Sequence, residues 1–195
     1  MINFEHQFWQ AGFKKIIGID EAGRGPLAGP VCIAGVIFDS SKTIPTGIND
    51  SKKLSATQRE NLFEKIKKAA ASYKIVFISE KQIDTLNILN AVKKGALTIV
   101  KALKPDFILT DAFNFNFRDV PQLALTKGDN KSVSIAAASI LAKVSRDRKM
   151  TEFSKKYPEY HFEKHAGYAT KKHVIAINQH GLSPIHRKSF KIPNY

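Results

Sequence analysis

Four acidic residues of this 195-residue chain have the types and placement of metal ligands. Asp20 and Glu21 follow one apolar segment, Asp111 follows another, and Asp129 lies in a Gly-Asp turn. Adjacent carboxylates after an apolar strand are unfavourable unless a positive charge neutralises them. Hard cations such as Mg²⁺ and Mn²⁺ take oxygen ligands. Four converging carboxylates could hold two metal ions about 4 Å apart, the arrangement that activates water and stabilises the leaving oxygen in phosphodiester cleavage.

Each acid also has a structural interpretation, in which Asp20 and Glu21 only solvate a strand end and Asp129 caps a helix. The charge of the chain favours the metal-site interpretation for the set. Lys and Arg number 31 against 17 Asp and Glu, which gives a net charge of +14 and a pI near 9.8. This balance indicates a polyanionic partner, nucleic acid before an acidic membrane surface. A basic surface that only aids solubility is the alternative.

Strands and helices must position these acids, and the hydrophobic pattern predicts both. Strands are expected over 15–20, 31–38, 73–79, 106–110 and 122–126. Helices are expected to begin at the capping box of Ser55 and Gln58 and to cover 86–103, 132–155 and 170–180. Gly181 is the expected end of the last helix. This order predicts an α/β fold in which helices flank a mixed sheet. Such sheets bind ligands at the ends of their strands.

The chain is expected to be one domain over 1–195. Its C-terminal part, about 143–195, is predicted to be helical and basic. This stretch holds 12 Lys or Arg and 4 Asp or Glu, so it carries +8 of the net charge. We therefore expect it to contribute to substrate binding.

The glycine-rich segment after the first strand nearly matches two phosphate-binding motifs. A P-loop requires Lys and Ser or Thr where Arg24 and Gly25 stand. A dinucleotide-binding motif must open a helix, but Pro26 and Pro30 follow at once and a second strand comes next. Both motifs are therefore set aside.

Other residue types limit the remaining classes of protein. The single cysteine, Cys32, lies in an apolar segment, which predicts a buried structural thiol and a reducing compartment. The chain shows no signal core and no apolar run near the ~20 residues of a membrane helix. We therefore expect a cytoplasmic protein without a membrane partner. His161 and His165 have an i, i+4 spacing, but no third residue completes a zinc site, so surface or hydrogen-bonded histidines are favoured.

The order of motifs resembles that of the ribonuclease HII family (type 2 ribonuclease H) in its bacterial form. The matching blocks are IDEAGRGPLAGPV at 19–31, DSKKLS at 50–55, KGD at 127–129, AASILAKVSRD at 137–147, HAGYAT at 165–170 and HRKSF at 186–190. This resemblance implies a ribonuclease H-like fold with a helical C-terminal portion. It also implies an endonuclease that hydrolyses the RNA strand of RNA–DNA hybrids and cuts on the 5′ side of single ribonucleotides in duplex DNA, leaving a 3′-hydroxyl and a 5′-phosphate.

The resemblance assigns roles to the acids. It implies that Asp20, Glu21 and Asp111 coordinate the metal ions, and that Asp129 is a fourth catalytic carboxylate that engages the second ion with substrate bound. The expected cofactor is Mg²⁺ or Mn²⁺, two ions per active site.

The resemblance also implies substrate contacts. Gly23-Arg24-Gly25 matches the family's ribonucleotide sensor, where glycines let the backbone approach a sugar and its 2′-hydroxyl. Tyr168 matches the tyrosine that packs on the sugar next to the junction, although a core or surface aromatic is its alternative. Lys52 and Lys143 match positions that meet backbone phosphates.

Expected partners follow from this set. They are RNA–DNA hybrids and DNA duplexes that contain ribonucleotides, met during ribonucleotide removal and primer removal in replication and repair. We expect a monomer, and residues 191–195 show no sliding-clamp-binding peptide. About fourteen residues precede the first strand, too few for the extra N-terminal domain of ribonuclease HIII.

Two other functions are the alternatives to this prediction. They are a non-catalytic nucleic-acid-binding protein and a metal nuclease with another substrate, such as a junction resolvase or transposase.

Overall fold

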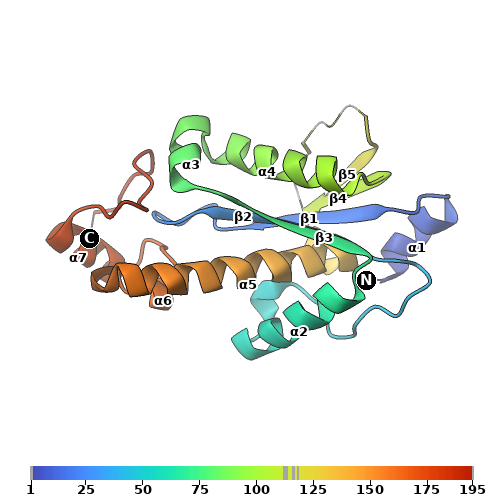
Figure 1. The fold of residues 1–195 in the computed structure, drawn as a ribbon, viewed down its shortest axis with the longest axis horizontal. Helices are drawn as coiled ribbons and strands as arrows, with labels where there is room; N and C mark the ends of the chain where they lie inside the picture. Colours follow the sequence, from blue (N-terminus) through green and yellow to red (C-terminus); the bar gives the residue numbers. More distant parts are fainter. Residues whose placement is uncertain (1, 112–113, 116, 118, 195) are drawn as a thin grey trace.

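Five strands form one mixed sheet in the computed structural model, which describes residues 2–111, 114–115, 117 and 119–194. The strands are β1 (Ile16–Ala22), β2 (Val31–Ile37), β3 (Ser72–Ile78), β4 (Phe107–Asp111) and β5 (Gln122–Leu125), in the spatial order β3-β2-β1-β4-β5 (Figure 1). β1 pairs antiparallel with β2 and β2 with β3, whereas β1–β4 and β4–β5 are parallel pairs. The predicted α/β fold with a mixed sheet is confirmed.

Helices cover both faces of this sheet and extend beyond one end of it (Figure 1). They are α1 (Ile2–Gln10), α2 (Ala56–Ala69), α3 (Glu80–Leu86), α4 (Ile88–Leu103), α5 (Val133–Lys156), α6 (Phe162–His165) and α7 (Lys171–His180). α3 and α4 lie over one face, α5 and α2 lie over the other, and α6 and α7 lie near the C-terminus. Among the described residues, none of these helices combines the length and the apolar character needed to cross a membrane.

One predicted helix begins later than expected, and three short helices, α1, α3 and α6, were not predicted. The helix expected over 86–103 begins at residue 88, because Asn87 has a φ of 64° and its side chain accepts a hydrogen bond from the Asn90 amide at 3.0 Å. The preceding residues form α3, which Ser79 caps. The capping box at Ser55 is present as expected. α1 and α6 are short, and their signals are correspondingly weak.

α1 is held in place by a long-range contact that the sequence pattern does not reveal. The buried carboxylate of Glu5 accepts hydrogen bonds from the Ser132 hydroxyl and from the Ser134 amide, the latter at 3.0 Å. These donors belong to the N-terminus of α5, where the helix dipole favours negative charge. Phe8 also packs on Phe107 of β4, with ring centroids 4.3 Å apart. The N-terminal helix therefore stabilises the start of α5.

α5 lies unusually close to β1 because both elements present small residues at their contact. A Cβ atom on Gly18 of β1 would come within 2.1 Å of the Ser134 carbonyl carbon and 2.3 Å of the Ile135 nitrogen. Farther along α5, Ala136, Ala137 and Ala138 are fully buried. This contact fixes the height of α5 over the end of β1, from which Asp20 and Glu21 project.

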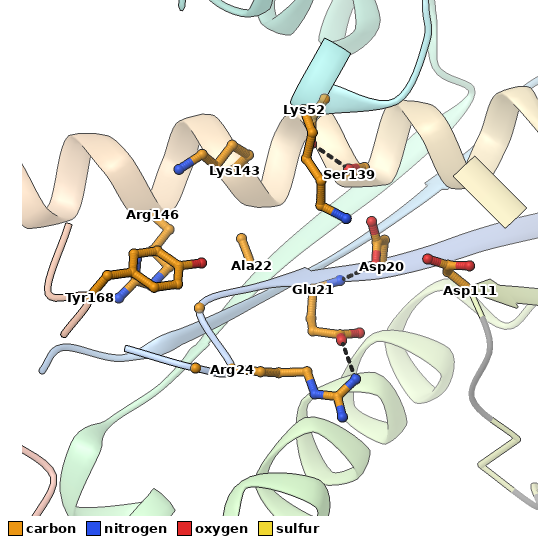
Figure 2. A pocket seen from close by; sticks show the side chains of 13 residues that line it. Asp20, Glu21, Ala22, Arg24, Lys52, Asp111, Ser139, Lys143, Arg146 and Tyr168 are labelled. Atoms are coloured by element: carbon orange, nitrogen blue, oxygen red, sulfur yellow. Dashed lines mark hydrogen bonds and ion pairs between the residues drawn. The ribbon is translucent and has the colours of Figure 1, made fainter. Parts of the chain in front are cut away.

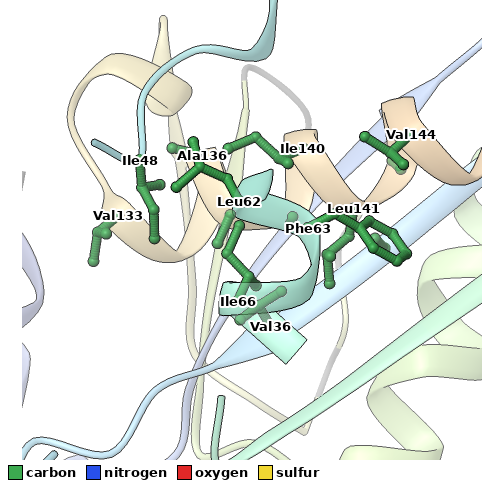
Figure 3. Close-up of a cluster of buried hydrophobic side chains, with 14 of the residues drawn as sticks. Val36, Ile48, Leu62, Phe63, Ile66, Val133, Ala136, Ile140, Leu141 and Val144 are labelled. Carbon is green, nitrogen blue, oxygen red and sulfur yellow. The ribbon is translucent and has the colours of Figure 1, made fainter. Parts of the chain in front are cut away.

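The second face of α5 packs against α2 and β2. Figure 3 shows this cluster, in which Leu62, Phe63 and Ile66 of α2 meet Ile140 and Leu141 of α5. All five side chains are buried. α5 is consequently covered from two sides, and its position is set by packing rather than by its own amphipathic pattern.

The close β1–α5 contact makes a substitution at Gly18 severe. We expect Gly18→Ala to lower the free energy of unfolding by about 3 kcal/mol or more, because the new methyl group would meet backbone that cannot move aside. Gly95→Ala is the matched control, since its Cβ would meet side-chain atoms of Ile33, Cδ1 at 2.5 Å and Cγ1 at 2.9 Å, rather than backbone. It also gains helix propensity, so it should destabilise the protein less than Gly18→Ala does. Urea denaturation measures both, and equal midpoints would contradict this packing.

Candidate active site

One cavity of about 670 Å³ opens at the carboxyl end of β1. Its lining consists of Asp20, Glu21, Ala22, Gly23, Arg24, Gly25, Ser51, Lys52, Asp111, Ser139, Lys143, Arg146 and Tyr168. Nine of the ten site residues expected from the sequence are in this set. The tenth, Asp129, lines an adjacent cavity of about 650 Å³ that shares Asp111 and Lys52 with the first. Residues spread over 149 positions of the sequence therefore meet at one place.

Strand register brings the first acids together. In the parallel pair β1–β4, Ile19 lies opposite Thr110, so Asp20 and Asp111 follow at neighbouring strand ends. Figure 2 shows the Asp20, Glu21 and Asp111 side chains gathered there, with Lys52 reaching toward them. The turn after β5 is tied to the same place, because the Gly128 amide donates a hydrogen bond to Asp111 Oδ1 at 2.8 Å. Asp129 follows directly and is 4% exposed.

The carboxylates of this cluster oppose one another's ionisation. Burial raises the pKa of Asp20 well above its usual value, and the charges of Glu21 and Asp111 raise it further. Burial also raises the pKa of Glu21, against the lowering effect of Arg24, whose Nη1 lies 3.3 Å from Glu21 Oε1. The pKa of Asp129 is raised first by burial and then by Asp50 and Asp111. The cluster therefore favours the arrival of positive charge.

The donor set fits a hard divalent cation. It offers carboxylate oxygens from two strand ends, partly desolvated, which are the ligands that Mg²⁺ and Mn²⁺ prefer. Within the ranges that the structure describes, no three Asp, Glu, His or Cys side chains already form a closed metal cage. Glu21 is turned toward Arg24, and Asp111 accepts the Gly128 amide. The acids are thus assembled at one place without being closed around a common point.

The loop after β1 forms the next part of the cavity wall. Gly23 has a φ of +100°, and a Cβ there would lie 2.0 Å from Arg146 Nε, so the fold itself requires glycine at this position. Gly25 has no such constraint, because its Cβ would make only ordinary contact with Tyr168 Cε1, at 3.8 Å. The missing side chain of Gly25 instead leaves space in front of the tyrosine ring.

Tyr168 presents its ring to this space. It is 45% exposed, which argues against the alternative of a core aromatic. The Arg146 guanidinium carbon lies 6.0 Å from the ring centroid. A half-exposed aromatic face beside a glycine and a buried cation is suited to packing on a sugar or base.

The two expected phosphate-binding lysines occupy different settings. Lys52 belongs to the 3₁₀ turn Ser51–Lys53 and reaches toward the acids, so it partly balances their charge (Figure 2). Lys143 lies on α5 and forms an ion pair with Asp147 at 2.8 Å. Sequence reasoning missed Ser139, which lines the cavity and exchanges a hydrogen bond with Ser51 at 2.7 Å. Its only signal was its place in a block that matches the family.

The remaining candidate groups have structural settings. His165 engages both ring nitrogens with backbone groups, Nε2 with the Tyr160 carbonyl at 2.9 Å and Nδ1 with the Gly167 amide at 3.2 Å. This arrangement supports a hydrogen-bonded histidine over a zinc ligand. Cys32 is buried, and burial raises the pKa of its thiol to about 12, which confirms the expected structural thiol.

Comparison with known proteins identifies the family of this chain. The family model for ribonuclease HII matches residues 17–192. A ribonuclease HII from Ruminiclostridium cellulolyticum is 54% identical over 192 residues, which cover 97% of this chain and 75% of the relative.

Solved structures show the same architecture. The chain superposes on ribonuclease H2 from Pyrococcus horikoshii with a TM-score of 0.76 and 27% identity, over 91% of this chain and 94% of the other. It superposes equally well, with a TM-score of 0.76 and 27% identity, on ribonuclease HII from the Archaeoglobus fulgidus complex with PCNA, over 93% of this chain and 97% of the other. These proteins have the ribonuclease H-like fold, which confirms that expectation.

The family match spans most of the chain, a bacterial relative is 54% identical over 97% of this chain, and three of the acids line one cavity. This chain therefore belongs to the ribonuclease HII family, the ribonucleases H that act as endonucleases on the RNA strand of RNA–DNA hybrids.

Proposed function

We propose that this ribonuclease H also cuts duplex DNA on the 5′ side of a single embedded ribonucleotide, leaving a 3′-hydroxyl and a 5′-phosphate. The observation that carries this proposal is one shared cavity. It places the carboxylates of Asp20, Glu21 and Asp111 beside the loop 23–25 and Tyr168. Chemistry and recognition of a 2′-hydroxyl can therefore act on neighbouring nucleotides.

The carboxylates supply the metal-binding half of the site. Members of this family need divalent metals, and we assign two ions, Mg²⁺ or Mn²⁺, to this site with substrate bound. Asp20, Glu21 and Asp111 would hold them, and Asp129 would join from the adjacent cavity. Bound metals activate water and stabilise the leaving oxygen. The protein's own contribution is to keep these acids together despite their repulsion and to present them at the end of a rigid sheet.

The loop and the tyrosine supply the selective half of the site. Backbone groups of Gly23-Arg24-Gly25 would approach the ribose and its 2′-hydroxyl, and Tyr168 would pack on the adjacent sugar. Lys52 and Lys143 would meet phosphates, which adds affinity without selecting a base. The basic segment 143–195 would extend this contact along the duplex.

The biological setting follows from this chemistry. We infer a cytoplasmic monomer, one domain over 1–195, that removes ribonucleotides and RNA primers during replication and repair. PCNA accompanies the Archaeoglobus fulgidus relative in its solved complex. We assign no clamp partner to this chain.

The direct test is cleavage of an end-labelled DNA duplex with one ribonucleotide. With Mg²⁺ or Mn²⁺ we expect a single cut on the 5′ side of that ribonucleotide, and with chelator no cut, because the acids require metal to act. A long RNA–DNA hybrid is the parallel substrate. If only the hybrid is cut, the protein still acts as a ribonuclease H, but the proposed recognition of a single 2′-hydroxyl by the loop 23–25 and Tyr168 is refuted. No cleavage of either substrate would favour a protein that only binds nucleic acid.

Asp20→Asn should separate chemistry from stability. We expect turnover to fall by about 10³-fold or more, because a charged metal ligand is lost. Binding of the hybrid should persist, since other residues meet its phosphates. The melting temperature in chelator should not fall, because the variant removes a buried charge whose neighbours repel it. Asp39→Asn, in the loop after β2 and outside both cavities, is the control. Near-normal turnover of Asp20→Asn would refute the metal-site assignment.

Gly25→Ala should impair recognition without harming the fold. Its methyl group meets only Tyr168 Cε1, at 3.8 Å, so the melting temperature should stay close to that of the wild type. Incision at a single ribonucleotide should fall by about 10-fold to 100-fold, because the methyl group occupies space meant for the sugar. Gly23→Ala is the contrast and should unfold at a much lower temperature. If folded Gly25→Ala cuts at the single ribonucleotide as well as the wild type, the loop 23–25 does not take part in ribonucleotide recognition.

A further inference from the structure

The loop 23–30 owes its shape to a residue outside the cavity. We propose that Arg187 is a positioning residue that sets how this loop presents residues 23–25 to a 2′-hydroxyl. This inference rests on the proposed function. It adds a residue from the far end of the chain that touches neither the metal site nor, in the proposed binding mode, the substrate.

Arg187 directs all three of its guanidinium nitrogens at carbonyls of this one loop. Nη2 donates to the Gly23 carbonyl at 2.6 Å, Nη1 to the Arg24 carbonyl at 2.9 Å, and Nε to the Gly29 carbonyl at 2.9 Å. The first two carbonyls belong to the peptide groups on either side of Arg24. The orientation of the peptides that would face the ribose is therefore fixed from behind.

The environment of Arg187 indicates that these carbonyls are its main partners. Its side chain is buried, with the residue 2% exposed, and among the described residues no carboxylate lies within ion-pair distance of it. Burial lowers its pKa to about 9, and the nearby Arg146 charge acts in the same direction. Asp84 and Glu80 oppose this lowering from beyond ion-pair distance. A buried cation without an ion-pair partner is unfavourable unless its hydrogen bonds are satisfied. Lysine cannot replace the planar fork that makes these three contacts.

The segment that carries Arg187 is fixed on both sides. The Arg187 amide donates to the Leu27 carbonyl at 2.8 Å, and the Gly29 amide donates to the Ile185 carbonyl at 2.8 Å. Beyond Arg187, the Asp84 carboxylate of α3 accepts hydrogen bonds from the amides of residues 188 and 189, both at 3.0 Å. The guanidinium is thus delivered by backbone that is tied to the loop and to α3.

The neighbouring residue connects the same segment to Tyr168. His186 Nδ1 accepts the Ser183 amide at 2.9 Å, so in the neutral ring Nε2 carries the proton. That nitrogen lies 3.0 Å from His173 Nε2, and His173 Nδ1 lies 2.9 Å from the Tyr168 carbonyl. Residues 186 and 187 therefore support both parts of the proposed 2′-hydroxyl recognition site, Tyr168 and the loop 23–25. The acids are positioned instead by the β1–β4 pairing. Loss of the Arg187 contacts should therefore impair recognition of the 2′-hydroxyl more than metal binding.

The test compares binding of two duplexes that differ only in one ribose 2′-hydroxyl. Dissociation constants are measured by fluorescence anisotropy in chelator, where no cleavage occurs, for the wild type and Arg187→Lys. We expect the wild type to prefer the ribonucleotide duplex and Arg187→Lys to lose that preference. Its affinity for the all-DNA duplex should change by less than about twofold, because phosphate contacts are retained. In cleavage assays of the ribonucleotide duplex kcat/KM should fall about tenfold or more, because the contacts to the 2′-hydroxyl are misplaced.

Two further variants keep the proposal falsifiable if Arg187→Lys folds poorly. Asp84→Asn weakens the anchor of the segment from the protein surface and should reduce the preference partially. Arg59→Lys is the matched control, because Arg59 also donates to two backbone carbonyls, those of Ser51 and Leu54. It should lower the melting temperature and leave the 2′-hydroxyl preference unchanged.

The outcomes are distinct. If folded Arg187→Lys and Asp84→Asn keep the wild-type preference, Arg187 is not a positioning residue, and the proposed function stands. The same conclusion follows if Arg59→Lys loses the preference as strongly as they do, since the effect would then track stability. If the wild type shows no preference, the proposed reading of the 2′-hydroxyl fails, and the role of Arg187 fails with it.

Discussion

The repulsion among carboxylates at the ends of β1 and β4 is the constraint that the rest of the structure accommodates. Asp20, Glu21 and Asp111 lie at one strand edge, and burial raises the pKa of the first two. An unsupported cluster of this kind would spread apart or become protonated. Here the parallel β1–β4 ladder fixes the two strand ends, and Lys52 and Arg24 offset part of the charge. The remaining repulsion lowers the folding stability at the place where cations are expected to bind.

α5 links this cluster to the core and to the substrate side of the cavity. Its close approach to β1 at Gly18 sets the height of the helix over the strand end. The same helix then supplies Ser139, Lys143 and Arg146 to the cavity lining. Because α2 covers the other face of α5, the helix cannot shift without opening the core. A change at Gly18 that displaces α5 would therefore also move the residues that α5 contributes to the cavity.

Two buried arginines organise the loop between β1 and β2 in a complementary way. Arg146 donates to the carbonyls of Ala28 and Pro30, and Arg187 donates to those of Gly23, Arg24 and Gly29. Carbonyls are thus satisfied from inside the protein along most of this loop. Positive charge below the loop also complements the acids at its start and suits a polyanionic substrate above it.

The sequence by itself determined the strands and the long helices, and through the resemblance of its motifs it named nine of the thirteen residues that line the first cavity. Alternation and apolar runs placed the strands, and Ser55 and Gly181 marked helix ends, because these signals are local. The break at Asn87, the anchoring of α1 by Glu5 and the loop contacts of Arg187 were decided only by the tertiary structure. Glu5 meets its partners 127 and 129 positions away, and Arg187 meets its own 158 to 164 positions away. No periodicity records such pairs, since a buried polar group is satisfied by whichever element the fold brings beside it.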